Sequence, residues 1–246
     1  MNQCKNCGFE VHDLYCSHCG QKSNPERITI FYIWHELLHF ITHMERGFFF
    51  TSLKMIVEPG QTVKNFIEGK RKNYQAPVSY FLIWTTVYIL LLYWIEKLFG
   101  VNVVIDYKEY FGTATTTKFA ISHLSFVLTM VIPFNALYLY LLVAKGRYNY
   151  MECIVAAIYA LGTVILFQFA FAIAALLIYA ISNTAVDLRI SDSLKIFYIS
   201  WFIISFIKLF PVKAKLSRVL LFIILAFGTF TLWRLYGFPL FINRFM

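Results

Sequence analysis

Charged residues are scarce in this chain of 246 residues. They make up 14% of it, against about 25% in a typical soluble domain, while hydrophobic residues make up 59% and aromatic residues 19%. This composition excludes a soluble globular protein and an intrinsically disordered one. It predicts an all-α integral membrane protein, because apolar segments of sufficient length cross a bilayer as helices.

Cysteine is also sparse, and its distribution is uneven. Four of the five cysteines lie within the first 19 residues, and five are too few for a secreted disulfide scaffold. A secretory signal is not expected, because the first apolar run begins only after Arg27 and follows a polar, cysteine-rich stretch. We therefore expect the N-terminus in the cytosol, where thiols stay reduced and paired CxxC motifs favour metal binding over disulfides.

Five apolar stretches are long enough to span a membrane, which takes roughly 20 helical residues. They run over 78–98, 121–143, 153–181, 194–210 and 217–242. The fourth stretch is short and ends just before Pro211, so four spans is the alternative count.

The distribution of lysine and arginine predicts the orientation of these spans. Nine basic residues precede Val78, and the later loops alternate between fewer and more basic residues. Since basic loops stay on the cytoplasmic side, the pattern predicts five spans with a cytosolic N-terminus.

Few polar side chains are expected inside the spans. His123 and Asn135 lie in the second stretch and Gln168 in the third, whereas Glu96 and Glu152 lie at span ends, where we expect them to reach the interface. We expect no aspartate or glutamate well inside a span, and such a residue is typical of a proton or ion pathway. A transporter or transporter subunit is therefore the second alternative function.

The strongest motif in the chain is a pair of CxxCG units near its start. Cys4 and Cys7 precede Gly8, and after eight residues Cys16 and Cys19 precede Gly20. Two residues between thiolates allow both sulfurs to reach one ion, and a glycine after each pair allows the tight turn. The pattern predicts a small cytosolic zinc ribbon over residues 1–24, with one structural zinc per chain bound by Cys4, Cys7, Cys16 and Cys19. Iron in a similar site and redox-active dithiols are the alternatives.

The charges of this ribbon indicate what it binds. Lys5 and Lys22 are offset by Glu10 and Asp13, so we expect no nucleic-acid partner. The motif resembles the zinc-ribbon knuckles at the head of many bacterial membrane and regulatory proteins, which favours docking of a protein partner.

Residues 25–77 are predicted to form three short interfacial amphipathic helices, separated by Gly47 and by Pro59-Gly60. The first, over 28–46, collects its histidines on one polar arc opposite an apolar face, so it should lie along the membrane surface. The arc contains His35, His39, His43 and Glu36.

Within this helix, residues 35–39 read HELLH and resemble the zincin HExxH motif. The resemblance implies His35 and His39 as zinc ligands and Glu36 as the general base of a membrane hydrolase. However, the continuation lacks the metzincin glycine and third histidine. Two other interpretations remain open: a water-facing side of an amphipathic helix, or a second, noncatalytic metal site formed by His35, His39 and His43.

A basic run precedes the first span. Lys70, Arg71 and Lys72 lie just before Pro77, where basic side chains can contact anionic lipid headgroups, at about 1 kcal/mol each. A topology signal is an equally compatible interpretation.

The order of these segments resembles a bacterial family of multi-span membrane proteins of unknown function with an N-terminal zinc ribbon. The resemblance covers residues 1–85 and is most specific at the three histidines, Gly47, Pro59-Gly60 and Gly69-Lys70-Arg71. It implies a membrane location and a zinc site, and it implies nothing about activity.

Together these patterns favour a non-enzymatic membrane scaffold or adaptor. Its domains would be the ribbon (1–24), an interfacial segment (25–77) and a transmembrane bundle (78–246). The ribbon would dock a protein partner or a second copy of the chain, and the zinc hydrolase is the first alternative.

Overall fold

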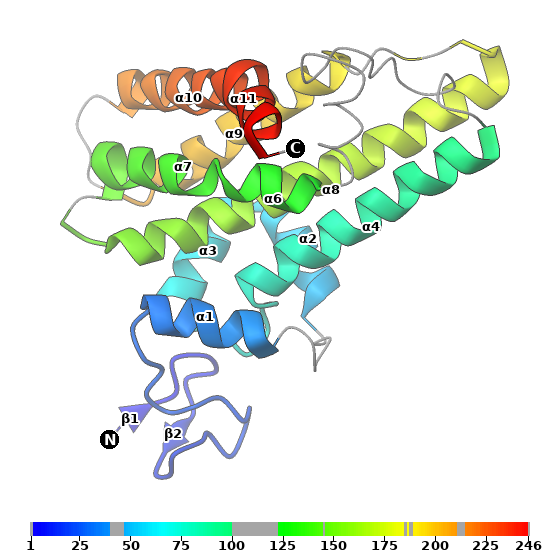
Figure 1. Cartoon of the computed structure of the whole chain (residues 1–246). Coiled ribbons are helices and arrows are strands. Elements are labelled where there is room, and N and C mark those ends of the chain that lie inside the picture. Colours follow the sequence, from blue (N-terminus) through cyan, green and yellow to red (C-terminus); the bar gives the residue numbers. More distant parts are fainter. Residues whose placement is uncertain are drawn as a thin grey trace.

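The computed structural model describes residues 2–39, 47–99, 123–144, 146–184, 186, 189–210 and 215–245. A small ribbon at one end leads through short helices into a bundle of long helices (Figure 1).

The N-terminal part follows the order expected from the sequence. The ribbon contains two antiparallel strands, β1 (Asn2–Gln3) and β2 (Glu10–Val11). Three short helices follow: α1 (Ile30–His39), α2 (Phe48–Val57) and α3 (Pro59–Ile67). The prediction of three helices is confirmed, and residues 40–46 of the first predicted helix lie outside the described residues.

Five helical segments in the described part of the chain are long and apolar enough to cross a membrane. The prediction of five is confirmed, and the alternative of four is wrong. The first, third and fourth are α4 (Pro77–Phe99), α8 (Tyr150–Ser182) and α9 (Arg189–Ile207). The second combines α6 (Leu124–Thr129), α7 (Ile132–Leu139) and the π-helix η1 (Tyr140–Ala144).

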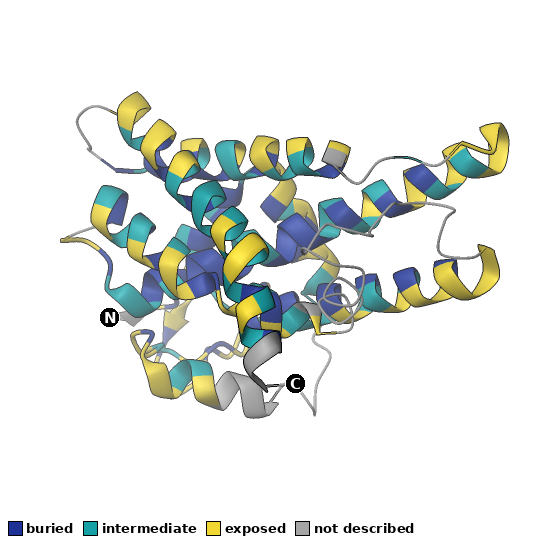
Figure 2. Ribbon diagram, turned by 45° about the horizontal axis from the view of Figure 1, so that its top comes forward, coloured by how far each residue is buried: buried dark blue, intermediate teal, exposed yellow. Residues whose placement is uncertain are grey.

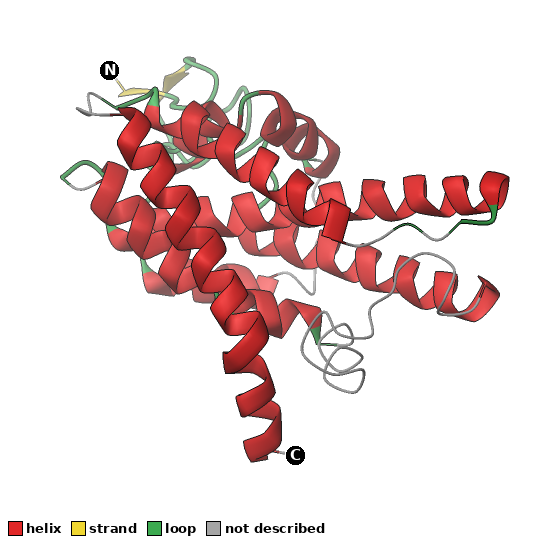
Figure 3. Ribbon diagram, turned by 90° about the horizontal axis from the view of Figure 1, so that it is seen from above, coloured by secondary structure: helices red, strands yellow, loops and turns green. Residues whose placement is uncertain are grey.

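The fifth span combines α10 (Lys215–Leu232), the π-helix η2 (Trp233–Gly237) and α11 (Phe238–Phe245). Figure 3 shows these three elements as one nearly continuous rod that leads to the C-terminus.

Helices α4 and α8 lie side by side and pack closely against each other (Figure 1). Tyr80 of α4 lies against Gly162 of α8, where an added Cβ would meet the tyrosine ring at 2.8 Å. The Tyr80 hydroxyl is within hydrogen-bond distance, 3.1 Å, of Thr163 Oγ1. A larger residue at position 162 would therefore separate the two longest helices of the bundle.

Exposure follows the pattern of a membrane protein. Buried positions line the interior of the helix bundle, and exposed positions follow the outer sides of the long helices (Figure 2). Many of the exposed side chains are large and apolar, including Leu90, Leu177 and Ile224. Such a surface is stable against lipid and costly in water.

Candidate metal centre and its junction with the bundle

The sulfur atoms of Cys4, Cys7, Cys16 and Cys19 all lie within 4.8 Å of one another. The Cys4 and Cys19 sulfurs are 3.6 Å apart, and so are the Cys7 and Cys16 sulfurs. Tetrahedral zinc with bonds of about 2.3 Å requires sulfur separations of about 3.8 Å. The four side chains predicted as ligands are therefore brought together, and their arrangement fits a four-coordinate ion.

The two CxxCG units fold in the same way. The Cys4 N–H donates to Phe9 O and the Gly8 N–H to Cys4 O, both at 2.8 Å. The equivalent bonds of the second unit run from Cys16 to Gln21 O at 2.8 Å and from Gly20 to Cys16 O at 2.7 Å. Gly8 and Gly20 have φ angles of 77° and 71°, a region that side chains other than glycine rarely adopt. The glycine after each cysteine pair is thus required by the turn.

The Cys4 thiol is prepared to act as a ligand. Burial raises its pKa, but hydrogen bonds from the backbone N–H groups of Cys7 and Asn6 outweigh this effect and bring the pKa down to about 7. A lowered pKa favours the thiolate, which is the form that binds a metal.

The ribbon carries exposed apolar groups. Phe9 stacks on His18 with ring centroids 5.3 Å apart, and Leu14 and Tyr15 project from the turn between the two cysteine pairs. These side chains are exposed, although the Tyr15 backbone pairs with Lys22.

Another part of the ribbon is docked on the loop that follows α3. The buried side chain of Gln21 donates to Gly69 O at 2.7 Å, and its Oε1 accepts from the backbone N–H groups of Arg71 and Lys72. Gly69 also lies against Lys5 and Pro25 and has a φ angle of 105°. The ribbon is therefore joined to the bundle by specific, buried contacts.

The three basic residues predicted to meet lipid headgroups are placed differently. Lys70 and Lys72 are exposed, whereas the Arg71 guanidinium donates to Glu26 O at 2.8 Å and lies over the Tyr32 ring, 4.7 Å from its centroid. Arg71 thus holds the linker between the ribbon and α1 against the segment after α3, and the two lysines remain open to solvent or lipid.

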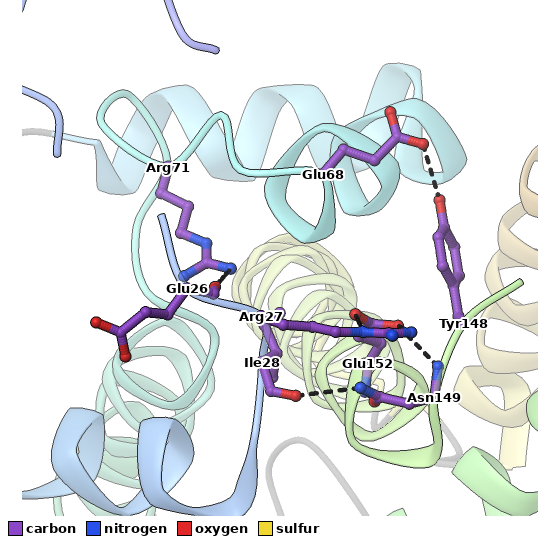
Figure 4. Close-up of polar contacts among 8 residues, drawn as sticks. All are labelled: Glu26, Arg27, Ile28, Glu68, Arg71, Tyr148, Asn149 and Glu152. Carbon is purple, nitrogen blue, oxygen red and sulfur yellow. Dashed lines mark hydrogen bonds and ion pairs between the residues drawn. The ribbon is translucent and has the colours of Figure 1, made fainter. Parts of the chain in front are cut away.

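Glu152 is buried at this junction, although the sequence suggested that it would reach the interface. Its side chain is 4% exposed and pairs with Arg27, with Nε to Oε1 at 3.0 Å (Figure 4). Glu152 and Asn149 also form a capping box at the start of α8, and Asn149 Nδ2 donates to Ile28 O. The expectation failed because the linker from the ribbon covers the N-terminus of α8.

Glu68 adds a second polar contact at the junction. The Tyr148 hydroxyl donates to Glu68 Oε1 at 3.4 Å (Figure 4). Arg147 Nη2 lies 3.8 Å from the same oxygen. Burial and the nearby Glu68 carboxylate raise the pKa of Tyr148, so its hydroxyl stays protonated and acts as a donor.

The HELLH segment is helical, since α1 extends to His39. The side chains of residues 35–39 and the whole of His43 lie outside the described residues, so the hydrolase and second-metal hypotheses remain predictions. On the described part of α1, Ile30, Phe31 and Trp34 are exposed. These apolar groups agree with a helix that rests on a membrane surface.

The other polar residues singled out from the sequence do not form one site. His123 occupies the N-cap position of α6, just before the second span, without a side-chain cap hydrogen bond. Gln168 Nε2 donates to Ser191 O at 3.4 Å. Asn135 lies on α7, and its Oδ1 is buried with no hydrogen-bond partner in the described part of the chain.

Sequence reasoning missed an ion-pair cluster within the spans. Asp192 of α9 contacts Lys195 Nζ at 2.6 Å and Arg234 Nη1 of η2 at 3.7 Å, and the three side chains are 19%, 14% and 18% exposed. Asp192 lies in the first turn of α9, at the end of the fourth span, so it does not contradict the expectation that no carboxylate lies well inside a span. Lys195 and Arg234 lay inside the predicted spans, and the Asp-to-Lys spacing of three residues was the available signal.

Fold and site together define an all-helical, multi-span membrane protein whose N-terminal ribbon carries a four-cysteine candidate metal site. Residues 45–89 match a family described as "Protein of unknown function (DUF3667)". The match covers α2, α3 and the first half of α4, and overlaps the region on which the family resemblance rests. No curated protein and no solved structure gives a significant match.

Proposed function

We propose that the protein is a non-enzymatic membrane adaptor: a zinc ribbon, held at the cytosolic face of the bundle, docks a protein partner. The observation that carries the proposal is that the ribbon is both docked on the bundle and exposes apolar side chains. Gln21 fixes it to the bundle, while Phe9, Leu14 and Tyr15 stay exposed. Exposed apolar groups on a small, rigid module are typical of a protein interface.

The proposed chemistry assigns the metal a structural role. Four thiolates fill the coordination sphere of zinc, so no position remains for a substrate. The ion would instead supply the folding energy of a module with a very small core.

The proposed orientation rests on the charges at the junction. Arg27, Arg71 and Arg147 gather there, at the end of the bundle that carries the ribbon. Because basic residues are retained on the cytoplasmic side, this arrangement supports a cytosolic ribbon. The proposed location in a bacterial cytoplasmic (inner) membrane rests on the family resemblance of residues 1–85.

The experiment combines a binding test with a functional one. A photo-crosslinking residue at Leu14 of the full-length protein in its native membrane should yield a defined protein adduct, and Tyr15→Ser should remove that adduct while metal content is unchanged. The same crosslinker at Glu10, an exposed position on β2, serves as control. A Leu14 adduct pattern that Tyr15→Ser does not change would contradict the adaptor.

The hydrolase alternative is separated by complementation of a deletion strain. Glu36→Gln removes the general base and leaves the ribbon intact, so an adaptor should complement fully. Loss of function in Glu36→Gln, with protein level and metal content preserved, would favour the hydrolase.

A further inference from the structure

Helix α2 has its polarity reversed relative to a water-soluble surface helix. Phe49, Leu53 and Val57 are 79%, 65% and 61% exposed. The inward face carries Thr51, Ser52 and Met55, which are all buried. An amphipathic helix in water turns its apolar stripe toward the core, so the exposed face of α2 is suited to a different environment.

Both inward hydroxyl groups form hydrogen bonds with other groups of the protein. Thr51 Oγ1 accepts from the Gln75 backbone N–H at 2.8 Å. Ser52 Oγ accepts from Trp84 Nε1 at 3.1 Å and donates to Phe48 O at 3.0 Å. The polar face of α2 therefore forms hydrogen bonds with residues at the start of α4, and these bonds take the place of water.

The break between α2 and α3 is also satisfied by protein groups. Met55 O accepts from the Tyr198 hydroxyl at 3.3 Å, and Ile56 O accepts from Trp201 Nε1 at 3.0 Å. After the break, the Gly60 N–H donates to Ser205 Oγ at 3.0 Å.

The side chains that form these three hydrogen bonds lie on one face of α9, at spacings of three and four residues. They are Tyr198, Trp201 and Ser205. Helix ends that meet water can leave their terminal carbonyls to the solvent, whereas in a bilayer the protein must supply the partners. The contact is close, because a Cβ at Gly60 would lie 2.5 Å from the Ser205 backbone.

Two features place α2 near the headgroups on the ribbon side. Gly47, before α2, lies against the backbone of Asn73 and Gln75, just before α4 begins, so the segment enters and leaves at the same end of the bundle. The charged groups of α2 and its C-cap, Lys54 and Glu58, pair with each other and are partly exposed. A paired lysine can extend its apolar stem through the acyl region and keep its charge at the headgroups.

The outward face of α2 continues the apolar surface of a spanning helix. Trp201 of α9 contacts Ile56 and is itself partly exposed, and Phe197 and Ile204 beside it are exposed as well. We propose that α2 is embedded in the leaflet on the ribbon side, with Phe49, Leu53 and Val57 in contact with lipid acyl chains. This makes α2 a membrane-inserted element of the bundle.

The test uses full-length protein reconstituted into vesicles of phosphatidylcholine and phosphatidylglycerol, with a benzophenone amino acid at one position at a time. Leu53 and Val57 are the test sites. Leu177, exposed on α8, is the lipid-facing control, and Leu14, exposed on the ribbon, is the water-facing control. Met55, on the buried face of α2, reports whether the helix is packed as described.

The expected result is a lipid adduct at Leu53 and Val57, as at Leu177, with no lipid adduct at Leu14. Mass spectrometry of the labelled peptide identifies the adduct, and Met55 should crosslink only within the chain. A Leu53 site that behaves like Leu14 would overturn the proposal. So would a band of two crosslinked chains at Leu53 and Val57 without lipid adduct, since that would identify a second copy as the occupant.

Discussion

The side-chain amide of Gln21 joins the candidate metal centre to the membrane bundle. Its Nε2 donates to Gly69 O at 2.7 Å, and its Oε1 accepts from the backbone N–H groups of Arg71 and Lys72 at 3.0 and 3.1 Å. The Gln21 carbonyl also accepts from Cys16 N–H. One residue therefore takes part both in the second cysteine turn and in the contact with the bundle.

Replacement of Gln21 by alanine should release the ribbon from the bundle. The change leaves three backbone groups, of which Gly69 O is buried, without a side-chain partner, at a cost of about 1 to 3 kcal/mol. Limited proteolysis of the full-length protein should therefore cut residues 22–29 about 10- to 100-fold faster. Metal content should not change. Gln3→Ala, at an exposed position on β1, is the matched control, and equal cleavage of both variants would contradict the contact.

Glu152 should contribute to stability through its hydrogen bonds and its charge. Glu152→Ala removes the carboxylate half of the α8 capping box and the Arg27 pair, so we expect a loss of about 2 to 4 kcal/mol, measured by thermal unfolding in detergent. Glu152→Gln keeps part of the cap and should cost less. Arg27 is 65% exposed, so Arg27→Ala should have the smallest effect of the three. The reverse order would show that Glu152 is not held as described.

The basic residues before α4 should separate into two roles. Lys70→Ala together with Lys72→Ala should reduce the anionic lipid that copurifies with the protein, because both side chains are exposed. Arg71→Ala should mainly lower thermal stability, since its guanidinium contacts Glu26 O and the Tyr32 ring. Native mass spectrometry measures the bound lipid. Unchanged lipid in the double lysine variant would refute the headgroup assignment.

The cluster around Asp192 should respond to charge balance. Asp192→Asn leaves Lys195 and Arg234 without their shared carboxylate and should lower the unfolding temperature. Adding Lys195→Met removes one of the two cations and should recover part of the loss. If the double variant is less stable than Asp192→Asn, the residues do not act as a charge-balanced unit.

Much of the architecture could be predicted because it depends on strong local patterns. Apolar length located five spans, and the CxxCG spacing brought four sulfurs together. Gly47 and Pro59 marked the boundaries of the short helices, since these residue types interrupt helices wherever they occur.

The tertiary contacts of the same segments could not be predicted in this way. The burial of Glu152 depends on Arg27, which is 125 residues away in sequence. The polarity of α2 becomes clear only when α4 and α9 supply partners for its inward face. The ion-pair cluster joins α9 to η2 across the bundle, and neither residue predicts the other from sequence spacing.

The central claim is that the ribbon is the structural metal centre of the protein, and metal content per chain tests it most directly. Full-length protein purified in detergent should contain one zinc, which Cys16→Ser should remove. Cys153→Ser, at a buried position in α8, is the matched control and should retain the zinc, as should His39→Ala. Zinc that survives Cys16→Ser and disappears in His39→Ala would contradict the account and place the metal on α1.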